Sequence, residues 1–351
     1  MKILFHIPSI YTITASRLVY QGYKNAFTDL GHQFRPLTNE DNPVDLFSQY
    51  KPDIFFTSIG PLLFKNLNLK LLKYQKKQGM KVFVNTPFWK SPMSKLRINE
   101  VPSVSENLKW IDLIKSGNFG DVYYNICEQD DPRMTGFSKI TGYPYHTVLL
   151  AADKTQPIES FTKKFSADIS FIGTYLPEKR DFMKKYLFPL SKKYDLKLYC
   201  QDLSLFDRSL SFIHKVGQYF NIPYLKSFKK NRVSFKEERQ IYRSSTVSVN
   251  IHENYQKKFG RDFNDRTFRI LFYGGFEITD EVNSMHKYFK NGKDIIIAKN
   301  AEDWLEKINY YLKYPEKRLP IMKAGRENVL NNHTYHNRVN QFLKIYKASF
   351  E

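Results

Sequence analysis

The chain alternates short apolar runs with longer amphipathic stretches, and few folds accommodate that order. Residues 2–7 (KILFHI) read as a buried strand, and residues 16–32 follow with apolar side chains at a helical period. Further strands are expected at residues 52–60 and 80–87, after intervening helical segments. This alternation predicts an α/β fold built on a parallel sheet with helices on both faces.

A polar interruption divides the alternation into two series. Residues 153–168 are mostly polar and contain Pro157, so we expect a linker there. A strand at residues 169–172 opens the second series, and 351 residues are more than one hydrophobic core usually fills. The sequence therefore predicts two doubly wound domains and a closing helix, at residues 1–155, 156–330 and 331–351 respectively.

Composition argues against several classes of protein. Hydrophobic residues make up 42% of the chain, which is enough to build ordinary cores and disfavours wholesale disorder. No stretch approaches the ~20 uninterrupted apolar residues of a membrane helix. The opening MKILFHIP lacks a long apolar region and a cleavage site, so it reads as a strand rather than a signal peptide. Cys127 and Cys200 lack partner spacing, and we expect buried free thiols in a reducing cytoplasm.

The balance of charges is strongly basic. Fifty-five Lys and Arg residues against 35 Asp and Glu residues give a formal net charge of +20. Such a surface attracts nucleic acid, anionic lipid headgroups or phosphorylated substrates. Residues 214–243 interleave basic with aromatic side chains, which suits either stacked bases or a membrane interface. A solvated basic face over an ordinary core is the simpler alternative.

A capped helix near residue 265 is a candidate anion site. Asn264 or Asp265 is a good N-cap, whose side chain accepts from a free helix N–H. Arg266 adds a fork suited to phosphate oxygens, and Thr267 adds a hydroxyl donor. The stretch predicts an anion site, although a capped core helix with a surface salt bridge would also explain it.

Two strand ends supply further polar candidates. Gly173 and Thr174 follow the strand that opens the second series, and Arg180 can bring charge to the same turn. Asn250 and His252 stand at the end of a later strand, ahead of the capped helix. Ligands of doubly wound sheets bind beyond the carboxyl ends of the strands, which is where these residues are expected. An ordinary strand-to-helix turn and a structural histidine are the alternatives.

Several familiar motifs do not occur in the sequence. The loop after the first strand, PSIYTITASR, has no G-x-G-x-x-G, which disfavours a dinucleotide-binding dehydrogenase. There is no C-x-x-C or H-E-x-x-H, and the pair Asp130–Asp131 is not a D-x-D clamp for a metal and a diphosphate. We therefore expect neither a metal nor a bound cofactor.

In order, these pieces resemble the C-terminal domain of CgeB-like, group 1-related glycosyltransferases. The segments DISFIGTYLPEKRDFMKKYL, VSVNIHE and RTFRILFYGGFEITD carry much of the resemblance, which covers most of residues 168–338. The N-terminal half matches only loosely. The resemblance implies a GT-B fold, with two Rossmann-like domains, an inter-domain cleft and a nucleotide-sugar donor held mainly by the second domain. It implies an acceptor-side role for the first domain.

The resemblance also implies roles for particular residues. Arg266 and Thr267 would meet the diphosphate at the helix start and take the place of a metal ion. Gly173 and Thr174 would face the donor. The full set of expected donor-binding residues is Gly173, Thr174, Arg180, Asn250, His252, Asn264, Arg266 and Thr267.

One position departs from the family's pattern. The family often reads R-x-F-E where this chain has RTFR, so Arg269 stands in place of the glutamate expected to hold the ribose. Either Arg269 meets an extra phosphate, or Glu277 or Glu302 holds the ribose. His6, at the end of the first strand, is the candidate catalytic residue, and the loop PSIYTITASR is the expected acceptor-side wall.

These features predict a metal-independent glycosyltransferase that moves a sugar from a nucleotide sugar to a glycan, lipid-linked or protein acceptor. We expect it in the cytoplasm or at the inner face of an anionic membrane, with residues 214–243 as the contact, and we do not expect nucleic acid as a partner. One alternative is a nucleotide-sugar epimerase, which needs paired carboxylates that the sequence does not reveal. The other is a non-catalytic GT-B-fold binder of polyanions, to which Arg269 points.

Overall fold

The computed structural model describes residues 1–59, 67–90, 105 and 107–351. Gly60, the last residue of the strand predicted at 52–60, lies outside these residues. The chain forms two compact units, of which the first comprises Met1–Leu149, Phe212–Lys229 and Val339–Glu351 and the second comprises Leu150–Ser211 and Lys230–Arg338. The segment Phe212–Lys229 belongs to the first unit, although it falls within the second predicted range. The three domain ranges stay a prediction.

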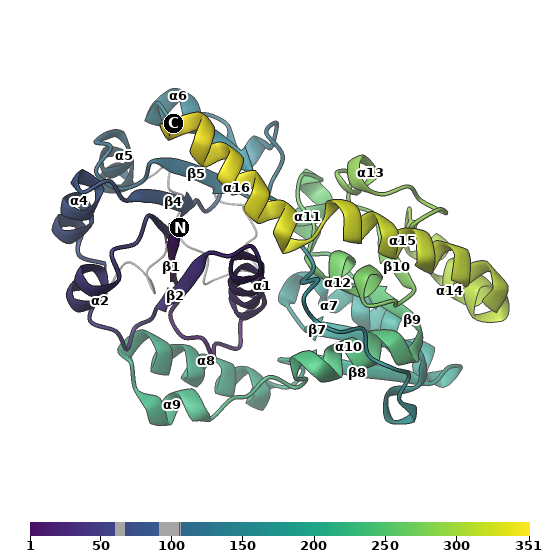
Figure 1. Ribbon diagram of the computed structural model, residues 1–351. Helices are drawn as coiled ribbons and strands as arrows, with labels where there is room; N and C mark the ends of the chain where they lie inside the picture. The colour runs from purple at the N-terminus through teal and green to yellow at the C-terminus, as the bar shows by residue number, and fades with distance from the viewer. Residues whose placement is uncertain (60–66, 91–104, 106) are drawn as a thin grey trace. The chain divides into compact units, whose positions relative to one another are not determined.

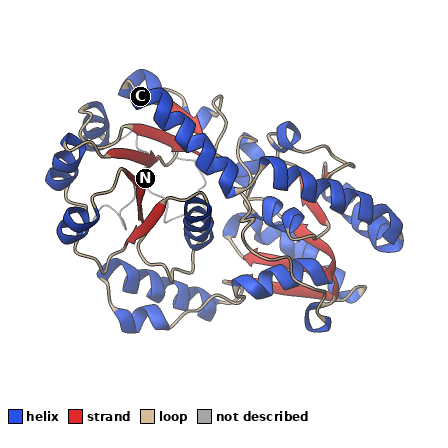
Figure 2. Cartoon of the chain, in the orientation of Figure 1, coloured by secondary structure: helices blue, strands red, loops and turns tan. Residues whose placement is uncertain are grey.

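The first unit is built on a parallel sheet with strand order β2-β1-β3-β4-β5-β6. Its apolar strands are buried along most of their length, as Ile54 and Phe55 show, because helices flank the sheet (Figure 2). The strands are β1 (Lys2–His6), β2 (Gln33–Leu37), β3 (Ile54–Ser58), β4 (Lys81–Asn85), β5 (Val122–Asn125) and β6 (Tyr145–Thr147).

Asparagine caps begin several helices of the first unit. The side chains of Asn42, Asn68 and Asn107 each accept a hydrogen bond from a backbone N–H of the helix that follows. The helices, labelled in Figure 1, are α1 (Ser16–Asp29), α2 (Pro43–Tyr50), α4 (Leu69–Lys77), α5 (Leu108–Lys115), α6 (Phe137–Thr141) and α9 (Pro223–Ser227), with the later parts of α8 (Leu205–Phe220) and α16 (Tyr335–Phe350).

The closing helix α16 joins the aromatic core of the first unit. The ring of Phe342 lies 5.0 Å from that of Phe56 and 4.8 Å from that of Tyr124, measured between centroids. Phe342 is fully buried. Contacts of this kind between aromatic edges and faces stabilise the core beyond the burial of their area.

The second unit contains a parallel sheet with strand order β11-β10-β9-β7-β8. Its strands are β7 (Ala167–Thr174), β8 (Leu196–Gln201), β9 (Ser245–Asn250), β10 (Glu277–Asp280) and β11 (Ile296–Ala298). Its helices are α7 (Arg180–Phe182), α10 (Phe235–Ser244), α11 (Asn254–Phe259), α12 (Arg266–Phe272), α13 (Met285–Tyr288), α14 (Ala301–Lys313) and α15 (Arg318–Asn332), with the first residues of α8 and α16.

In each sheet the direction in which the chain adds new strands reverses at one point. The chain adds β2 on one side of β1 and β3 on the other, so the first sheet switches between β1 and β3. In the second sheet β8 and β9 lie on opposite sides of β7, so the switch lies between β7 and β9. The predicted architecture of two doubly wound parallel sheets is confirmed, and such switch points are where sheets of this class bind ligands.

Among the residues that the structure describes, no helix combines the length and the apolar character needed to span a bilayer.

Candidate functional site

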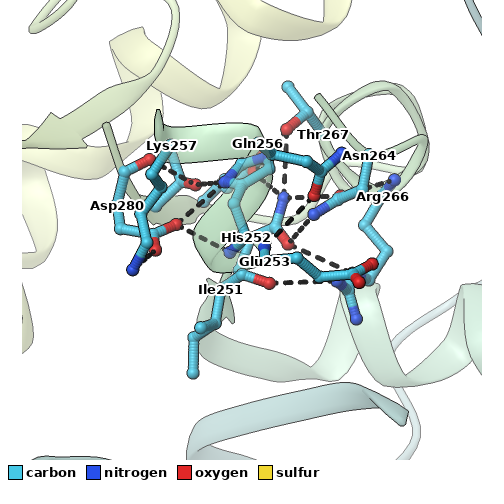
Figure 3. Close-up of polar contacts among 12 residues, drawn as sticks. Ile251, His252, Glu253, Gln256, Lys257, Asn264, Arg266, Thr267 and Asp280 are labelled. Atoms are coloured by element: carbon cyan, nitrogen blue, oxygen red, sulfur yellow. Dashed lines mark hydrogen bonds and ion pairs between the residues drawn. The ribbon is translucent and has the colours of Figure 1, made fainter. Parts of the chain in front are cut away.

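Polar and charged side chains gather at the switch point of the second sheet. Asn250 ends β9, and His252 follows it. Arg266 begins α12, the second helix after β9. All three side chains are buried. Figure 3 shows His252 and Arg266 with residues that they contact. The structure therefore brings together three of the residues that the sequence singled out.

Arg266 ties the carboxyl ends of two strands to α12. Its Nη1 donates to the carbonyl of Ile172 at 2.8 Å, and its Nη2 donates to the carbonyl of Ile251 at 3.2 Å. Its Nε donates to Oδ1 of Asn250 at 3.1 Å. A Cβ at Gly173 would lie 2.2 Å from Nη1 of Arg266, so glycine is needed for the guanidinium to lie across β7. Each of these nitrogens thus has a protein acceptor, and contact with phosphate stays a prediction.

Asn264, not Asp265, caps the start of α12. The side chain of Asn264 accepts from the backbone N–H of Arg266 at 3.2 Å, whereas Asp265 occupies the cap position without a side-chain cap bond. Nδ2 of Asn250 lies 3.0 Å from Oδ1 of Asn264 and 3.1 Å from Oγ1 of Thr267. These bonds hold the helix start against the end of β9.

Glu277 lies beneath the same cluster as a buried carboxyl group. Its Oε1 accepts from Nδ2 of Asn250 at 2.8 Å and from Oγ1 of Thr267 at 2.9 Å, while Oε2 has no hydrogen-bond partner among the described residues. Burial raises the pKa of Glu277 to about 7, although both hydrogen bonds oppose the shift. The carboxyl group of Glu277 is buried and bonds to Asn250 and Thr267. These contacts do not favour the suggestion that it holds a ribose. Glu302, the other suggested residue, is exposed in the first turn of α14.

His252 is held by an aspartate that the sequence did not single out. Its Nδ1 lies 2.8 Å from Oδ1 of Asp280, which also accepts from the backbone N–H of His252 at 2.9 Å. Nζ of Lys257 lies 3.2 Å from Oδ2 of Asp280 (Figure 3). Burial lowers the pKa of His252, so the ring is neutral at pH 7 and carries its proton on Nδ1. Nε2 is then an acceptor without a partner among the described residues.

The charge of Asp280 is stabilised by the same contacts. Burial pushes the pKa of Asp280 upward, but the hydrogen bonds from His252 and the charge of Lys257 outweigh it, so the pKa lies below its usual value. Asp280 ends β10, which pairs with β9. Its place at the carboxyl end of a strand was the signal in the sequence that could have identified it.

Lys179 is a second buried cation near this site. It lies in a 3-10 turn, Pro177–Lys179, that follows β7, and only 3% of its surface is exposed. Its charge contributes to lowering the pKa of His252 and opposes the burial-driven rise in the pKa of Asp265. The sequence drew attention to its neighbour Arg180 instead.

Arg180 stands apart from the cluster. It is half-buried at the start of α7, where Nε donates to the carbonyl of Tyr175 at 3.4 Å and the guanidinium lies 5.3 Å from the centre of the Tyr175 ring. Gly173 and Thr174 end β7 and are also half-buried. Arg180 thus packs on Tyr175, and its contact with a donor stays a prediction.

Arg269 is engaged within the fold. It forms ion pairs with Glu238 of α10 and, through Nε at 3.2 Å, with Oδ2 of Asp265. Its side chain is 11% exposed, and burial lowers its pKa to about 10. Arg269 therefore links α12 to α10, which does not favour the suggestion that this cation is presented to an extra phosphate.

His6 lies at the switch point of the first sheet. Its Nδ1 is 3.0 Å from Oγ1 of Thr57 on β3, and Nε2 has no hydrogen-bond partner among the described residues. Burial lowers the pKa of His6 to about 3. The ring is neutral at pH 7 and is a weak base, and its catalytic role stays a prediction.

No group of three or more His, Cys, Asp or Glu side chains in the described part of the chain is placed to hold a metal ion. The expectation that the chain works without a metal is not tested by this observation.

Residues 191–344 match the family described as glycosyl transferase-like. No curated protein matches the chain in sequence. The fold is similar to that of sucrose-phosphate synthase from Thermosynechococcus elongatus, with a TM-score of 0.61, 11% identity and 99% of each chain covered.

Two further solved structures contain a nucleotide. HepE from Anabaena in complex with UDP has a TM-score of 0.60 at 9% identity, covering 99% of this chain and 100% of that chain. An alpha-glucosyltransferase in complex with UDP and a 13-mer DNA has a TM-score of 0.63 at 12% identity, with 99% of each chain covered. At such identities the likeness shows the fold, which is the predicted GT-B architecture. The family match and this fold confirm the predicted resemblance of the C-terminal half to group 1-related glycosyltransferases.

Proposed function

We propose that the second unit binds a nucleotide-sugar donor through its diphosphate at the switch point between β7 and β9. The observation that carries this proposal is the burial of two cations, Arg266 and Lys179, at the carboxyl ends of the strands. Cations that are fixed at the ends of strands attract anions, and a diphosphate supplies two negatively charged groups. The neutral Nε2 of His252 adds an acceptor for a sugar or ribose hydroxyl.

The transfer proceeds without a metal ion in this proposal. Sugar transfer leaves a nucleoside diphosphate with increased negative charge, which must be stabilised in the transition state. Arg266 and Lys179 can supply that stabilisation, because fixed cations in a water-poor site act more strongly than cations in solution. UDP is the first nucleotide to test, since HepE and the alpha-glucosyltransferase were solved with it.

The acceptor is a glycan, a lipid-linked saccharide or a protein, and the enzyme works at the cytoplasmic face of an anionic membrane. The net charge of +20 supports this location, because cytoplasmic leaflets carry negative charge. The solved alpha-glucosyltransferase contains DNA, so DNA belongs among the acceptors to be compared, although we do not propose it.

A thermal-shift screen in EDTA tests the donor site. UDP, GDP, ADP and CMP, each with a corresponding sugar, are added to the full chain. A nucleotide at ~100 times its Kd should stabilise the fold by about 2.7 kcal/mol. The nucleotide sugar that shifts the melting temperature is then assayed for release of the nucleoside diphosphate with and without Mg²⁺. Release in EDTA supports the proposal, whereas the absence of any shift, or release that requires Mg²⁺, contradicts it.

A non-catalytic binder of polyanions is the second candidate. It is favoured by Arg269, which stands where the family often has glutamate and pairs with Glu238. Binding to nucleic acid with a steep dependence on salt, together with no response to any nucleotide sugar, would favour this candidate over a transferase.

A further inference from the structure

Helix α8 turns its polar side toward the protein and its apolar side toward solvent. Ser211, His214 and Gln218 are buried at a helical spacing. On the same helix Phe206 is 72% exposed and Phe212 is 65% exposed. A helix that packs on a globular core has the opposite arrangement.

Helix α9 packs closely against α8 to form a hairpin (Figure 1). A Cβ at Gly217 would lie 2.8 Å from the backbone nitrogen of Lys226, so the two backbones meet where α8 has no side chain. Nδ1 of His214 lies 2.7 Å from the carbonyl of Lys226. These contacts define the hairpin as a built element of the first unit.

The buried side of the hairpin is attached by polar contacts to loops at one edge of the first sheet. Nδ2 of Asn39, in the loop after β2, donates to the carbonyl of Gln218 at 3.0 Å. Nζ of Lys226 lies 2.7 Å from Oε1 of Glu40 in the same loop. Oγ1 of Thr12, in the loop after β1, donates to Oε1 of Gln218 at 3.5 Å. The hairpin therefore lies beside PSIYTITASR, the loop expected to form the acceptor-side wall.

The outer side of the hairpin is apolar and aromatic. Tyr224 of α9 is 72% exposed, as prominently as Phe206 on α8. We define the hairpin face as the first-unit side chains Phe212, Ile222, Tyr224 and Phe228, all of which are exposed. Large apolar side chains gathered on one element mark a site of interaction.

Basic side chains border the hairpin face. Arg208 lies four residues before Phe212 and Lys215 lies three residues after it, so helical geometry places both cations beside that ring. Lys215 is exposed, and Arg208 is partly exposed. Aromatic side chains bordered by cations suit the headgroup region of an anionic bilayer, where rings enter the interface and cations meet the lipid phosphates.

We propose that the hairpin face docks the chain onto an anionic membrane and so presents the acceptor-side loop to a membrane-anchored acceptor. The proposal about the acceptor rests on the proposed function, because it takes the chain to be a glycosyltransferase. The docking itself follows from the hairpin alone. Among the acceptors considered above, it selects the lipid-linked class.

Co-sedimentation with vesicles tests the docking. The full chain is mixed with phosphatidylcholine vesicles that contain or lack phosphatidylglycerol. We expect binding to the anionic vesicles that weakens with salt, and at least tenfold weaker partitioning after Phe212→Ser combined with Tyr224→Ser. The control combines Tyr74→Ser with Phe161→Ser, which removes rings that are 58% and 62% exposed elsewhere, and should bind as the wild type does.

A single charge change tests the role of the cations. Lys215→Gln should weaken partitioning about fivefold, since a cation near an anionic surface contributes ~1 kcal/mol. Lys73→Gln removes an exposed cation from α4 and should have no effect. Equal binding to both kinds of vesicle, or equal losses in the variants and their controls, would overturn the proposal. A wild type that dimerises through rings lost in the double variant would also overturn it.

The nucleotide thermal shift of each variant separates this proposal from the proposed function. Vesicle binding without any nucleotide response would support the docking surface and contradict the proposed transferase function. A nucleotide response without vesicle binding would support the transferase function and overturn the docking surface.

Discussion

The two sheets have switch points of the same topology and different chemistry. In the first sheet the neighbouring strand ends bring together His6 and Thr57, both uncharged at neutral pH. In the second sheet the corresponding place carries Arg266, with Lys179 and the pair His252–Asp280 close by. The difference shows that topology provides a place for a ligand in both units, whereas charge indicates which unit binds an anion.

The charge of the hydrogen-bond acceptors distinguishes a structural arginine in the second unit from the arginine that we propose to bind a ligand. Arg269 is fully engaged by Glu238 and Asp265. Within the described ranges, the guanidinium of Arg266 donates to neutral acceptors, the carbonyls of Ile172 and Ile251 and the amide oxygen of Asn250. These neutral acceptors hold the guanidinium in place, and its charge also opposes the burial-driven rise in the pKa values of Asp265 and Glu277. In the proposed function the same charge attracts the diphosphate.

Removing Arg266 should have the largest effect on stability. Arg266→Ala leaves two carbonyls and the Asn250 amide without their donor in a buried place, and we expect a loss of about 3–5 kcal/mol in the free energy of unfolding. Urea denaturation measures it. Arg180→Ala, which removes a half-buried arginine outside the cluster, serves as control and should cost less than about 1 kcal/mol. Equal costs for the two variants would show that the cluster is not a structural unit.

The stability contributed by Glu277 should depend on pH. Its pKa of about 7 in the fold lies above its ordinary value, so the stabilisation is complete below pH 4.5 and is lost as pH rises through 7. Glu277→Gln keeps an acceptor for Asn250 and Thr267 but cannot ionise. The variant should therefore gain up to about 3 kcal/mol relative to the wild type between pH 4.5 and 8.

Denaturation of both proteins across this pH range measures the difference. A constant difference in the free energy of unfolding would mean that the Glu277 carboxyl titrates normally.

A matched pair of threonine variants compares the two switch points directly. Thr57→Val removes the partner of His6, and Thr267→Val removes a donor to Glu277. Each should cost about 1–2 kcal/mol, because each leaves a buried polar group without its hydrogen bond. Only Thr267→Val should reduce the thermal shift caused by UDP. A reduction of that shift by Thr57→Val would show that the first switch point also contributes to the donor site.

Local sequence patterns predicted the sheets and the positions of the strand ends. The apolar run at residues 169–172 lies within β7, and Asn250 stands at the end of β9 as expected. Such features depend on residues that are neighbours in the chain, where side-chain periodicity and turn residues determine the local structure. The sequence also placed Gly173, Asn250 and Arg266 at one edge of the second sheet, because ligands of such sheets bind beyond the carboxyl ends of the strands.

Contacts between distant residues could not be predicted. His252 meets Asp280 only because β9 and β10 pair in one register, and Arg269 meets Glu238 only because α10 lies beside α12. Lys179 and Arg180 are adjacent in the chain, and only the turn after β7 decides that the lysine is buried while the arginine packs on Tyr175. The sequence did not reveal that α8 exposes its apolar side, because the spacing of its apolar residues matches that of a helix packed on a core.

The central claim is that buried cations at the second switch point bind the donor diphosphate. The most direct test is a calorimetric titration of UDP in EDTA into the wild type, Lys179→Met and Arg180→Gln. Methionine keeps the apolar stem of Lys179 and removes its ammonium group. We expect at least a tenfold increase in Kd for Lys179→Met, or ~1.4 kcal/mol, and no significant change for Arg180→Gln. Unchanged affinity in Lys179→Met, or a loss confined to Arg180→Gln, would contradict the account.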